Sequence, residues 1–282
     1  MDVIAYLRRA ARLLPTGLRW KLFSWRYGYS PWPGRAAAPP WTRDGDVLRI
    51  DLDGVRFVVP ARWVGRLAYQ LAGNAASREE ARAFARASRQ HAGALLFDVG
   101  AAHGLYSLAH CAAHAANRAV LFEPAPPLVE EGRDGIALNG CTDRCEIRHV
   151  AVSDAPGRCG GRLDELGYAQ ILPPGEGTFS VPLVRLDDEV ERIGAPPALL
   201  KIDVEGHELR VLRGAKDLLA RYKPLLFLEI HADLLRLRQE GPDAIVSLLE
   251  PLGYRFYAHH GAPLSGRRVA RTLHAILRVQ AR

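Results

Sequence analysis

The stretch from Asp98 to Gly104, which reads DVGAAHG, places an acid and two glycines after an apolar run. Gly100 lets the backbone turn sharply and approach a ligand closely, and the helix predicted after Gly104 would offer free N–H groups at its first turn. A pyrophosphate site uses the spacing GxGxxG, whereas this loop has GxxxG preceded by a carboxylate. The loop therefore predicts a site for a cofactor that carries an ammonium group. Its predicted residues are Asp98, Gly100, Ala102 and Gly104.

Two further acidic positions follow later runs of strand character. Glu123 ends the run Ala119–Glu123, and a carboxylate there can accept hydrogen bonds from both hydroxyls of a ribose. Ser153 and Asp154 follow a third run, where Ser153 could line an adenine ring and Asp154 could accept from its exocyclic amine. An ordinary turn would also contain this pair. Together with the glycine loop, these positions predict a nucleoside-binding site.

The densest group of ionisable residues follows the apolar run Leu199–Val204, in the segment KIDVEGHE that ends at Glu208. Another acid and a histidine end the run Leu225–Ile230, in the segment EIH. Because ligands bind beyond the carboxyl ends of parallel strands, both groups are expected on the same rim. Clusters of this kind are usually functional. The predicted catalytic residues are Asp203, His207, Glu229 and His231, acting directly in proton transfer.

A metal-dependent version of this site is the alternative. Asp203 and Glu229 could together hold a divalent ion that orients an acceptor and lowers its pKa. Direct proton transfer is favoured over this version, so no metal ligand is predicted. His110 and His114 have the i, i+4 spacing of metal ligands, but no third ligand accompanies them.

These residues need a scaffold that brings strand ends together, and the pattern from Ala94 onwards supplies one. Short apolar runs alternate with segments of helical periodicity, which predicts an α/β fold with a doubly wound, mainly parallel sheet and helices on both faces. Thr272–Val279 is predicted to be a last, antiparallel strand. The predicted strands are Leu95–Val99, Ala119–Glu123, Cys145–Val152, Leu199–Val204 and Leu225–Ile230, and the predicted helices are Leu105–Ala116, Pro126–Asn139, His207–Arg221 and Asp233–Glu250.

The first part of the chain has a different pattern, which predicts a small extension over residues 1–91 before the main domain at 92–282. Residues 1–27 alternate apolar and basic side chains as amphipathic helices do, and the proline-rich residues 31–40 predict a strap. Val47–Val59 reads as a β-hairpin that turns at Asp53-Gly54. Ser77 and Glu80 have the spacing of a capping box, which predicts a helix that runs to about Gln90.

Composition and charge limit the class of protein. With 48% hydrophobic and 24% charged residues, the chain has the composition of a globular protein. No signal peptide is visible, so the four cysteines are expected to be buried thiols in a cytoplasmic protein. Both ends of the chain are rich in arginine. The basic, tryptophan-containing residues 1–27 would suit peripheral contact with an anionic inner membrane surface, and no nucleic-acid partner is predicted.

The motifs, taken together, resemble the FkbM-type methyltransferase family. The resemblance covers residues 95–231 and is carried by DVGAAHGLYSL, LFEP, LNG, AVSD, VRLDD, LLKIDVEGHELRVLRGA and KPLLFLEIH, in that order. It implies a class I methyltransferase (Rossmann-like) fold and S-adenosylmethionine as the cofactor. It also implies O-methylation of a small-molecule hydroxyl, on a sugar, glycolipid or polyketide.

Two other functions compete with this one. A nicotinamide-dependent oxidoreductase could use a similar sheet, but the third glycine of its fingerprint is missing. A non-catalytic, membrane-associated nucleoside-binding module would fit the basic N-terminus, but it would leave the polar rim around Asp203 and Glu229 without a role.

Overall fold

A computed structural model of the chain describes residues 39–281, apart from residue 74 and the segments 165–166, 259–260 and 271–273. The strands of its main sheet are β4 (Leu95–Val99), β5 (Arg118–Phe122), β6 (Cys145–Arg148), β11 (Leu199–Ile202), β12 (Leu225–His231), β13 (Tyr254–Ala258), β14 (Pro263–Leu264) and β15 (His274–Ala281). Their order is β14-β13-β15-β12-β11-β4-β5-β6. From β6 to β12 neighbouring strands are parallel, and β15 is antiparallel to both β12 and β13. The switch point, where a doubly wound sheet binds its ligands, lies between β4 and β11.

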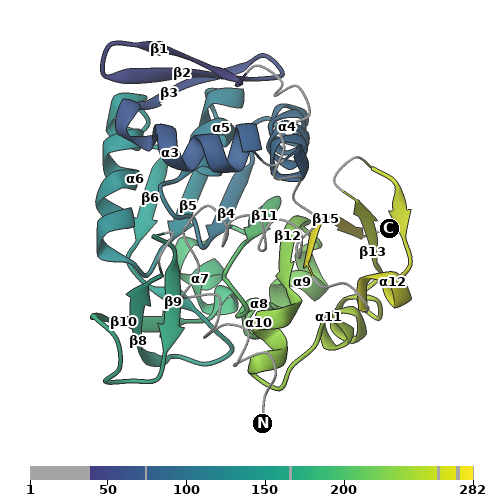
Figure 1. Cartoon of the computed structure of the whole chain (residues 1–282). Helices are drawn as coiled ribbons and strands as arrows, with labels where there is room; N and C mark the ends of the chain where they lie inside the picture. Colours follow the sequence, from purple (N-terminus) through teal and green to yellow (C-terminus); the bar gives the residue numbers. More distant parts are fainter. Residues whose placement is uncertain (1–38, 74, 165–166, 259–260, 271–273, 282) are drawn as a thin grey trace, which may run out of the picture.

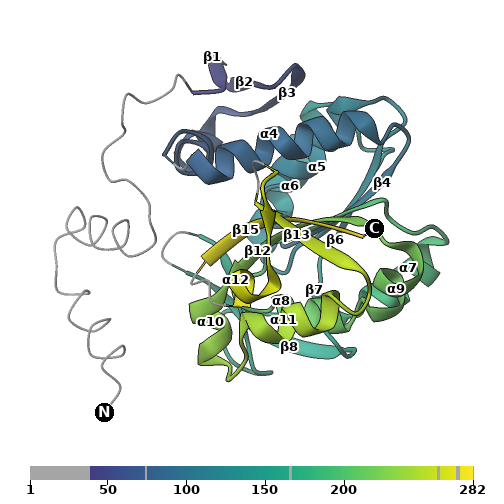
Figure 2. The same ribbon diagram turned by 90° about the vertical axis from the view of Figure 1, so that its right-hand side faces the viewer.

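Helices cover both faces of this sheet (Figure 2). They are α5 (Leu105–Ala113), α6 (Pro126–Leu138), α7 (Leu186–Ile193), α8 (Glu208–Arg213), α9 (Lys216–Tyr222), α10 (Ala232–Leu237), α11 (Pro242–Leu249) and α12 (Gly266–Ala270). Successive strand residues point into two separate cores, as the pleat requires: Leu96 and Leu199 into one, Phe97 and Leu200 into the other. The predicted α/β fold with a doubly wound, mainly parallel sheet and an antiparallel last strand is confirmed.

The described part of the N-terminal extension is a three-stranded sheet followed by helices. It comprises β1 (Trp41–Asp44), β2 (Val47–Leu52), β3 (Val55–Pro60), the 3-10 turn Ala61–Trp63, α3 (Val64–Leu67), the π-helical segment Ala68–Gly73 and α4 (Ala75–Gln90). The predicted hairpin is confirmed, because Asp53 and Gly54 both have the positive φ that its two-residue turn requires. Apolar residues between Leu48 and Ala87 share one core with strands β4, β5, β11 and β12. The extension is thus packed into the same core as the sheet.

The capping box predicted for Ser77 and Glu80 is wrong. The helix α4 begins at Ala75, so Ser77 lies inside it. The side chain of Glu80 is buried and turned toward the sheet, where its Oε1 lies 3.1 Å from Nζ of Lys201 on β11. Its Oε2 accepts a hydrogen bond of 2.6 Å from the hydroxyl of Tyr106. The side chain of Lys201 is only 1% exposed, so Glu80 supplies the negative charge that a buried ammonium needs.

A second, four-stranded sheet is inserted between β6 and α7, and the sequence did not predict it. Its strands are β7 (Ala151–Val152), β8 (Gly157–Leu163), β9 (Ala169–Leu172) and β10 (Phe179–Val184), in the order β7-β10-β8-β9. It lies at the lower left of Figure 1. The single strand predicted for Cys145–Val152 is therefore wrong, since β6 belongs to the main sheet and β7 to this insertion.

Two predicted helices are each divided in two. The helix predicted for His207–Arg221 is interrupted between α8 and α9 at Gly214, where a Cβ would lie 2.0 Å from the carbonyl oxygen of Ser153. The helix predicted for Asp233–Glu250 is interrupted between α10, which ends at Leu237 before Gln239 with its positive φ, and α11, for which Gly241 is the N-cap and Pro242 the first residue. The other predicted helices and strands occur with ends shifted by a few residues.

The apolar stretch from residue 92 to 116 forms β4, the glycine loop and α5. None of the helices in the described ranges is long and apolar enough to cross a membrane. The amphipathic helices predicted for residues 1–27, and most of the strap predicted for 31–40, lie outside the described residues. All four cysteines are buried and free, as expected.

The loops that leave β4 and β11 pack backbone against backbone. Gly100 has φ +75°, and a Cβ at this position would lie 1.8 Å from the carbonyl oxygen of Asp203. The amide of Asp203 also donates a hydrogen bond of 3.0 Å to the carbonyl of Val99. Only glycine permits this contact, so Gly100 fixes the distance between the cofactor loop and the first residue of the predicted catalytic rim.

Replacing Glu80 should lower the stability of the whole domain. Glu80→Gln leaves the buried Lys201 without its nearest charge, and breaking a buried pair from one side costs about 3–5 kcal/mol. Asp44→Asn is the matched control, because Asp44 pairs with Arg49 where both side chains are largely exposed, and such pairs contribute at most about 1 kcal/mol. Denaturant unfolding of both variants measures the difference. Equal, small losses in the free energy of unfolding would show that the pair between Glu80 and Lys201 does not stabilise the domain.

Gly100→Ala should destabilise the chain more than its backbone conformation alone explains. The left-handed φ costs an alanine about 1–2 kcal/mol, and the clash with Asp203 adds about 1–3 kcal/mol of overpacking. Gly194→Ala isolates the first contribution, because Gly194 has φ +72° and a Cβ added there would have no neighbouring atom within 4 Å. Thermal and denaturant unfolding compare the two variants. The contact with Asp203 is unimportant if both lose the same stability.

Candidate active site

The loop after β4 is built by hydrogen bonds to the end of β5. The amides of Gly100 and Ala101 both donate to the carbonyl of Phe122, at 3.0 and 3.2 Å. Ala102 has φ +49°, a left-handed conformation that is uncommon for a residue other than glycine. In this conformation its amide donates to Oε2 of Glu123 at 2.8 Å. Gly104 caps the first turn of α5 with φ +85°, so the predicted loop residues and Glu123 lie together.

The carboxylate of Glu123 has both oxygens in hydrogen bonds to backbone amides. Besides the amide of Ala102, the amide of Ala125 donates to Oε1 at 2.8 Å. The residue is 3% exposed, and burial raises the pKa of Glu123 to about 7, against the opposing effect of these two amides. Each oxygen retains a second lone pair, so the carboxylate can still accept a hydroxyl.

Asp98 holds the start of α5. Its Oδ2 accepts hydrogen bonds from the hydroxyl of Ser107 at 2.7 Å and from the amide of Ser107 at 3.2 Å. The residue is 1% exposed, and burial raises the pKa of Asp98 to about 6. The carboxylate of Asp98 is thus directed toward α5, and Asp98 supports the glycine loop by fixing the first turns of the helix that follows it.

His207 lies next to the residues predicted to contact adenine. Its Nε2 is 3.3 Å from the hydroxyl of Ser153, which in turn donates to Oδ1 of Asp154 at 3.1 Å. The imidazole is 6% exposed, and burial lowers the pKa of His207 to about 4. The structure therefore groups His207 with Ser153 and Asp154, whereas the sequence placed it with the catalytic rim.

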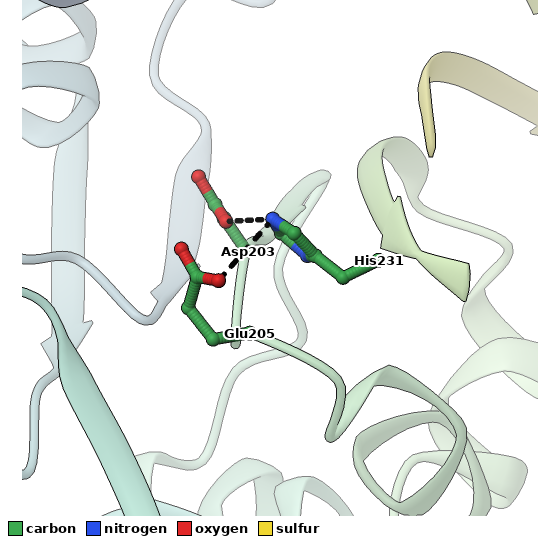
Figure 3. A group of neighbouring side chains, drawn as sticks. All are labelled: Asp203, Glu205 and His231. Carbon is green, nitrogen blue, oxygen red and sulfur yellow. Dashed lines mark ion pairs between the residues drawn. The ribbon is translucent and has the colours of Figure 1, made fainter. Parts of the chain in front are cut away.

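The other three predicted catalytic residues do meet, and Glu205 joins them. Nε2 of His231 lies 3.6 Å from Glu205, 3.7 Å from Glu229 and 4.0 Å from Asp203; Figure 3 shows the imidazole facing Asp203 and Glu205. We call Asp203, Glu205, Glu229 and His231 the rim cluster. Its side chains are between 12% and 30% exposed, so they are partly accessible at the ends of β11 and β12.

Charges within the rim cluster shift the pKa values of its members. Burial raises the pKa of the Asp203 carboxyl well above its usual range, and the neighbouring Glu229 raises it further. Burial alone would lower the pKa of His231. The carboxylate of Glu205 and the hydrogen bond to Glu208 outweigh that effect, so the pKa of His231 lies well above its usual value. Within the rim cluster, the protonated forms of Asp203 and His231 are therefore both favoured relative to the free side chains.

Lys201 lies directly beneath the rim cluster. Its Nζ is 3.7 Å from Oδ2 of Asp203 and 3.8 Å from Oε2 of Glu229, and it stands 4.9 Å from the centre of the Tyr106 ring. Burial would lower the pKa of Lys201, but Glu80 and the two rim carboxylates outweigh it and raise the pKa above its usual value. The ammonium is thus a fixed positive charge that favours ionised carboxylates above it.

Sequence reasoning did not select four residues of this site: Glu80, Lys201, Glu205 and Glu208. Lys201 could have been found, because a lysine inside an otherwise apolar strand must be paired. Glu205 and Glu208 lie in the segment already singled out, and the positive φ of Glu205 turns its side chain to the rim. Glu80 gave no such signal, since it is more than a hundred residues from its partner.

Comparison with known proteins identifies the family. The family model described as the methyltransferase FkbM domain matches residues 98–256, which is more than half of the chain. No curated protein matches the chain. Among solved structures, the methyltransferase FkbM from Methylobacillus flagellatus KT is 16% identical over 78% of this chain and 59% of its own, with a TM-score of 0.45.

Two other solved structures have a similar level of likeness. The SAM-dependent methyltransferase from Agrobacterium tumefaciens is 10% identical, with 85% of this chain and 71% of its own covered and a TM-score of 0.45. The O-methyltransferase from Bacillus cereus in complex with SAH is 12% identical, with 78% and 88% covered and a TM-score of 0.41. At these TM-scores the likeness adds nothing to the family match and the sheet order. On those two grounds the chain belongs to the FkbM methyltransferase family and is an S-adenosylmethionine-dependent methyltransferase of the class I fold.

Proposed function

We propose that this methyltransferase acts on a hydroxyl group of a small molecule, such as a sugar, a glycolipid or a polyketide. The observation that carries the proposal is the rim cluster itself. A hydroxyl must lose its proton when its oxygen is methylated, and the rim offers three carboxylates that each lie within 4.0 Å of the imidazole nitrogen Nε2 of His231. A positioned base of this kind typically contributes about 10²–10⁴-fold to the rate.

The cofactor would lie beyond β4 and β5, on the loop that holds Glu123. The carboxylate of Glu123 would accept the ribose hydroxyls, as acids at this position of doubly wound sheets do. Backbone groups of Gly100, Ala102 and Gly104 would approach the amino-acid part, and Ser153 with Asp154 would flank the adenine. Asp98 would act indirectly, because its carboxylate already holds Ser107.

S-adenosylmethionine supplies an electrophilic methyl group on its sulfonium and leaves as neutral S-adenosylhomocysteine. The rim cluster would act on the methyl acceptor, by removing the proton of its hydroxyl group. Asp203 or Glu229 would take the proton from the hydroxyl, and the ammonium of Lys201 beneath them opposes the rise that burial causes in the pKa of Asp203. Because Gly100 packs on the backbone of Asp203, the methyl donor and the proton acceptor would be held at a constant separation, which is how alignment lowers a barrier.

The acceptor class, like the absence of a nucleic-acid partner, stays a prediction. Peripheral contact of residues 1–27 with an anionic membrane and a cytoplasmic location also stay predictions. No observation on the described residues favours the non-catalytic binding module. The alternative of a nicotinamide-dependent oxidoreductase is set aside, because the family match is to a methyltransferase domain.

Cofactor affinity should depend on pH through Glu123. Its ionised form accepts the ribose hydroxyls, so with a pKa of about 7 the affinity for S-adenosylhomocysteine should fall about tenfold from pH 8 to pH 6. Glu123→Gln should bind about tenfold or more weakly at pH 8, because charge-assisted hydrogen bonds are lost. Its affinity should also vary less with pH. Isothermal titration calorimetry gives both values.

The exposed Glu130 on α6 is the control for this experiment. Glu130→Gln should match the wild type at every pH, because Glu130 is exposed on α6, away from Glu123, and pairs with Arg133 at the surface. Asp98, with a pKa of about 6, is present in the wild type and in both variants. A difference between the wild type and Glu123→Gln in how affinity varies with pH therefore arises from Glu123. Identical pH curves for wild type and Glu123→Gln would remove Glu123 from the cofactor site.

Turnover should depend on the rim carboxylates far more than cofactor binding does. Asp203→Asn and Glu229→Gln should each lower the rate of S-adenosylhomocysteine production by about 10²–10⁴-fold and leave its binding within a few-fold. His231→Gln and His207→Ala should slow turnover less. Glu191→Gln, on the exposed face of α7, is the control. The assay follows a screen of sugars, glycolipids and polyketide alcohols, and full activity of Asp203→Asn would exclude a catalytic role for that carboxylate.

A further inference from the structure

Three side chains of the rim cluster have the arrangement of metal ligands. One ligand atom from each of Asp203, Glu205 and His231 can be chosen so that all lie within 4.8 Å of one another. The two carboxylates come from the loop after β11 and the imidazole from the end of β12, and they converge on one point in Figure 3. Ligands at about 2.1 Å from a common ion lie roughly 3.0–3.5 Å apart. The observed 3.6 and 4.0 Å from Nε2 of His231 to the two carboxylates therefore need only a small contraction.

The orientation of His231 is set by a buried carboxylate behind it. Oε1 of Glu208 lies 2.7 Å from Nδ1 of His231 and also accepts a hydrogen bond of 2.9 Å from the amide of Gly206. Glu208 itself is fully buried. With Glu208 ionised, Nδ1–H donates a hydrogen bond to Oε1 of Glu208, while Nε2 faces the rim carboxylates. Metal-binding histidines are oriented in this way, by a carboxylate on the ring nitrogen that does not bind the metal.

The balance of charge also favours a cation at this point. In the described part of the chain, the rim and the residues beneath it bring together the carboxylates of Asp203, Glu205, Glu208, Glu229 and Glu80. The cationic groups in contact with them are Lys201 and His231. Lys201 lies on the side of Glu80, away from Glu205. Among the described residues, the imidazole of His231 is the cationic group that acts on Glu205, and a divalent ion would add positive charge at this point.

We propose that Asp203, Glu205 and His231 form a binding site for a divalent cation of the Mg²⁺ or Mn²⁺ class. Two carboxylates and one imidazole suit such an ion and leave coordination positions for water and for an oxygen of the acceptor. This ligand set differs from the pair Asp203 and Glu229 considered from the sequence. Glu229 lies outside the group of three ligand atoms, and it would remain as the carboxylate that takes the proton.

The role of the ion rests on the proposed function, whereas its binding does not. If the acceptor is a hydroxyl, the ion would orient its oxygen and lower its pKa. Glu229 would take the hydroxyl proton, the new bond would form between that oxygen and the methyl carbon, and the bond from that carbon to sulfur would break. Charge balances because the sulfonium becomes a neutral thioether.

Binding of Mn²⁺ alone tests the site on the full-length protein after chelation and dialysis. Electron paramagnetic resonance of free Mn²⁺ should show one ion bound per chain, displaced by excess Mg²⁺. Asp203→Asn, Glu205→Gln and His231→Gln should each weaken binding at least tenfold. Glu208→Gln should weaken it about 10–100-fold through the orientation of His231. Glu191→Gln, outside the cluster, should bind as the wild type does.

Thermal unfolding and S-adenosylhomocysteine affinity confirm that each variant is folded. No stoichiometric Mn²⁺ binding by the wild type, or equal binding by folded His231→Gln and wild type, would overturn the inference. Methylation of a hydroxyl at full rate in excess chelator would overturn the role of the ion while supporting the proposed function. Mn²⁺ binding that depends on these residues, with no hydroxyl substrate accepted, would support the site and count against O-methylation.

Discussion

The buried ammonium of Lys201 is the constraint on which the site depends. A charge that is 1% exposed in the middle of a sheet must be paired, and its nearest partner, Glu80, comes from α4 in the N-terminal extension. The extension and the sheet are therefore held together by an electrostatic requirement as well as by a shared core. On its other side the same ammonium faces Asp203 and Glu229. One buried lysine thus links the packing of the described part of the extension, from residue 39 to 90, to the charge state of the rim.

The sequence predicts the parts of the fold and site that follow from local rules. Strand β4 was placed without error, because its apolar run is bounded by a helix before it and a glycine loop after it. The turn at Asp53-Gly54 follows from the positive φ both residues adopt. That Asp203 would meet His231 could be expected, because β11 and β12 are parallel neighbours and their carboxyl ends share an edge.

The failures have causes that no local pattern contains. His207 is only four residues from Asp203, yet positive φ angles at Glu205 and Gly206 reverse the chain and send its side chain to Ser153. The Glu80–Lys201 pair joins residues whose proximity depends on the tertiary fold. The inserted sheet β7-β10-β8-β9 was not predicted from the sequence. Strand β8 is rich in glycine and strand β9 is half-buried, so neither has the clear alternation of apolar and polar residues by which a strand is recognised.

The rigid and variable parts of the site have separate tasks. Gly100 packs the loop after β4 against the backbone of Asp203, which holds the proposed cofactor loop and the proposed catalytic rim at a fixed separation. Selection of the acceptor must then come from the surrounding segments. The insertion is one of these, since Asp164 after β8 lies close enough to raise the pKa of Glu205, and Arg238 donates to the carbonyl of Ile171 in β9. A segment inserted beside the rim could change the shape of the proposed acceptor site without disturbing the loop proposed to hold the cofactor, as expected for folds whose specificity resides in grafted segments.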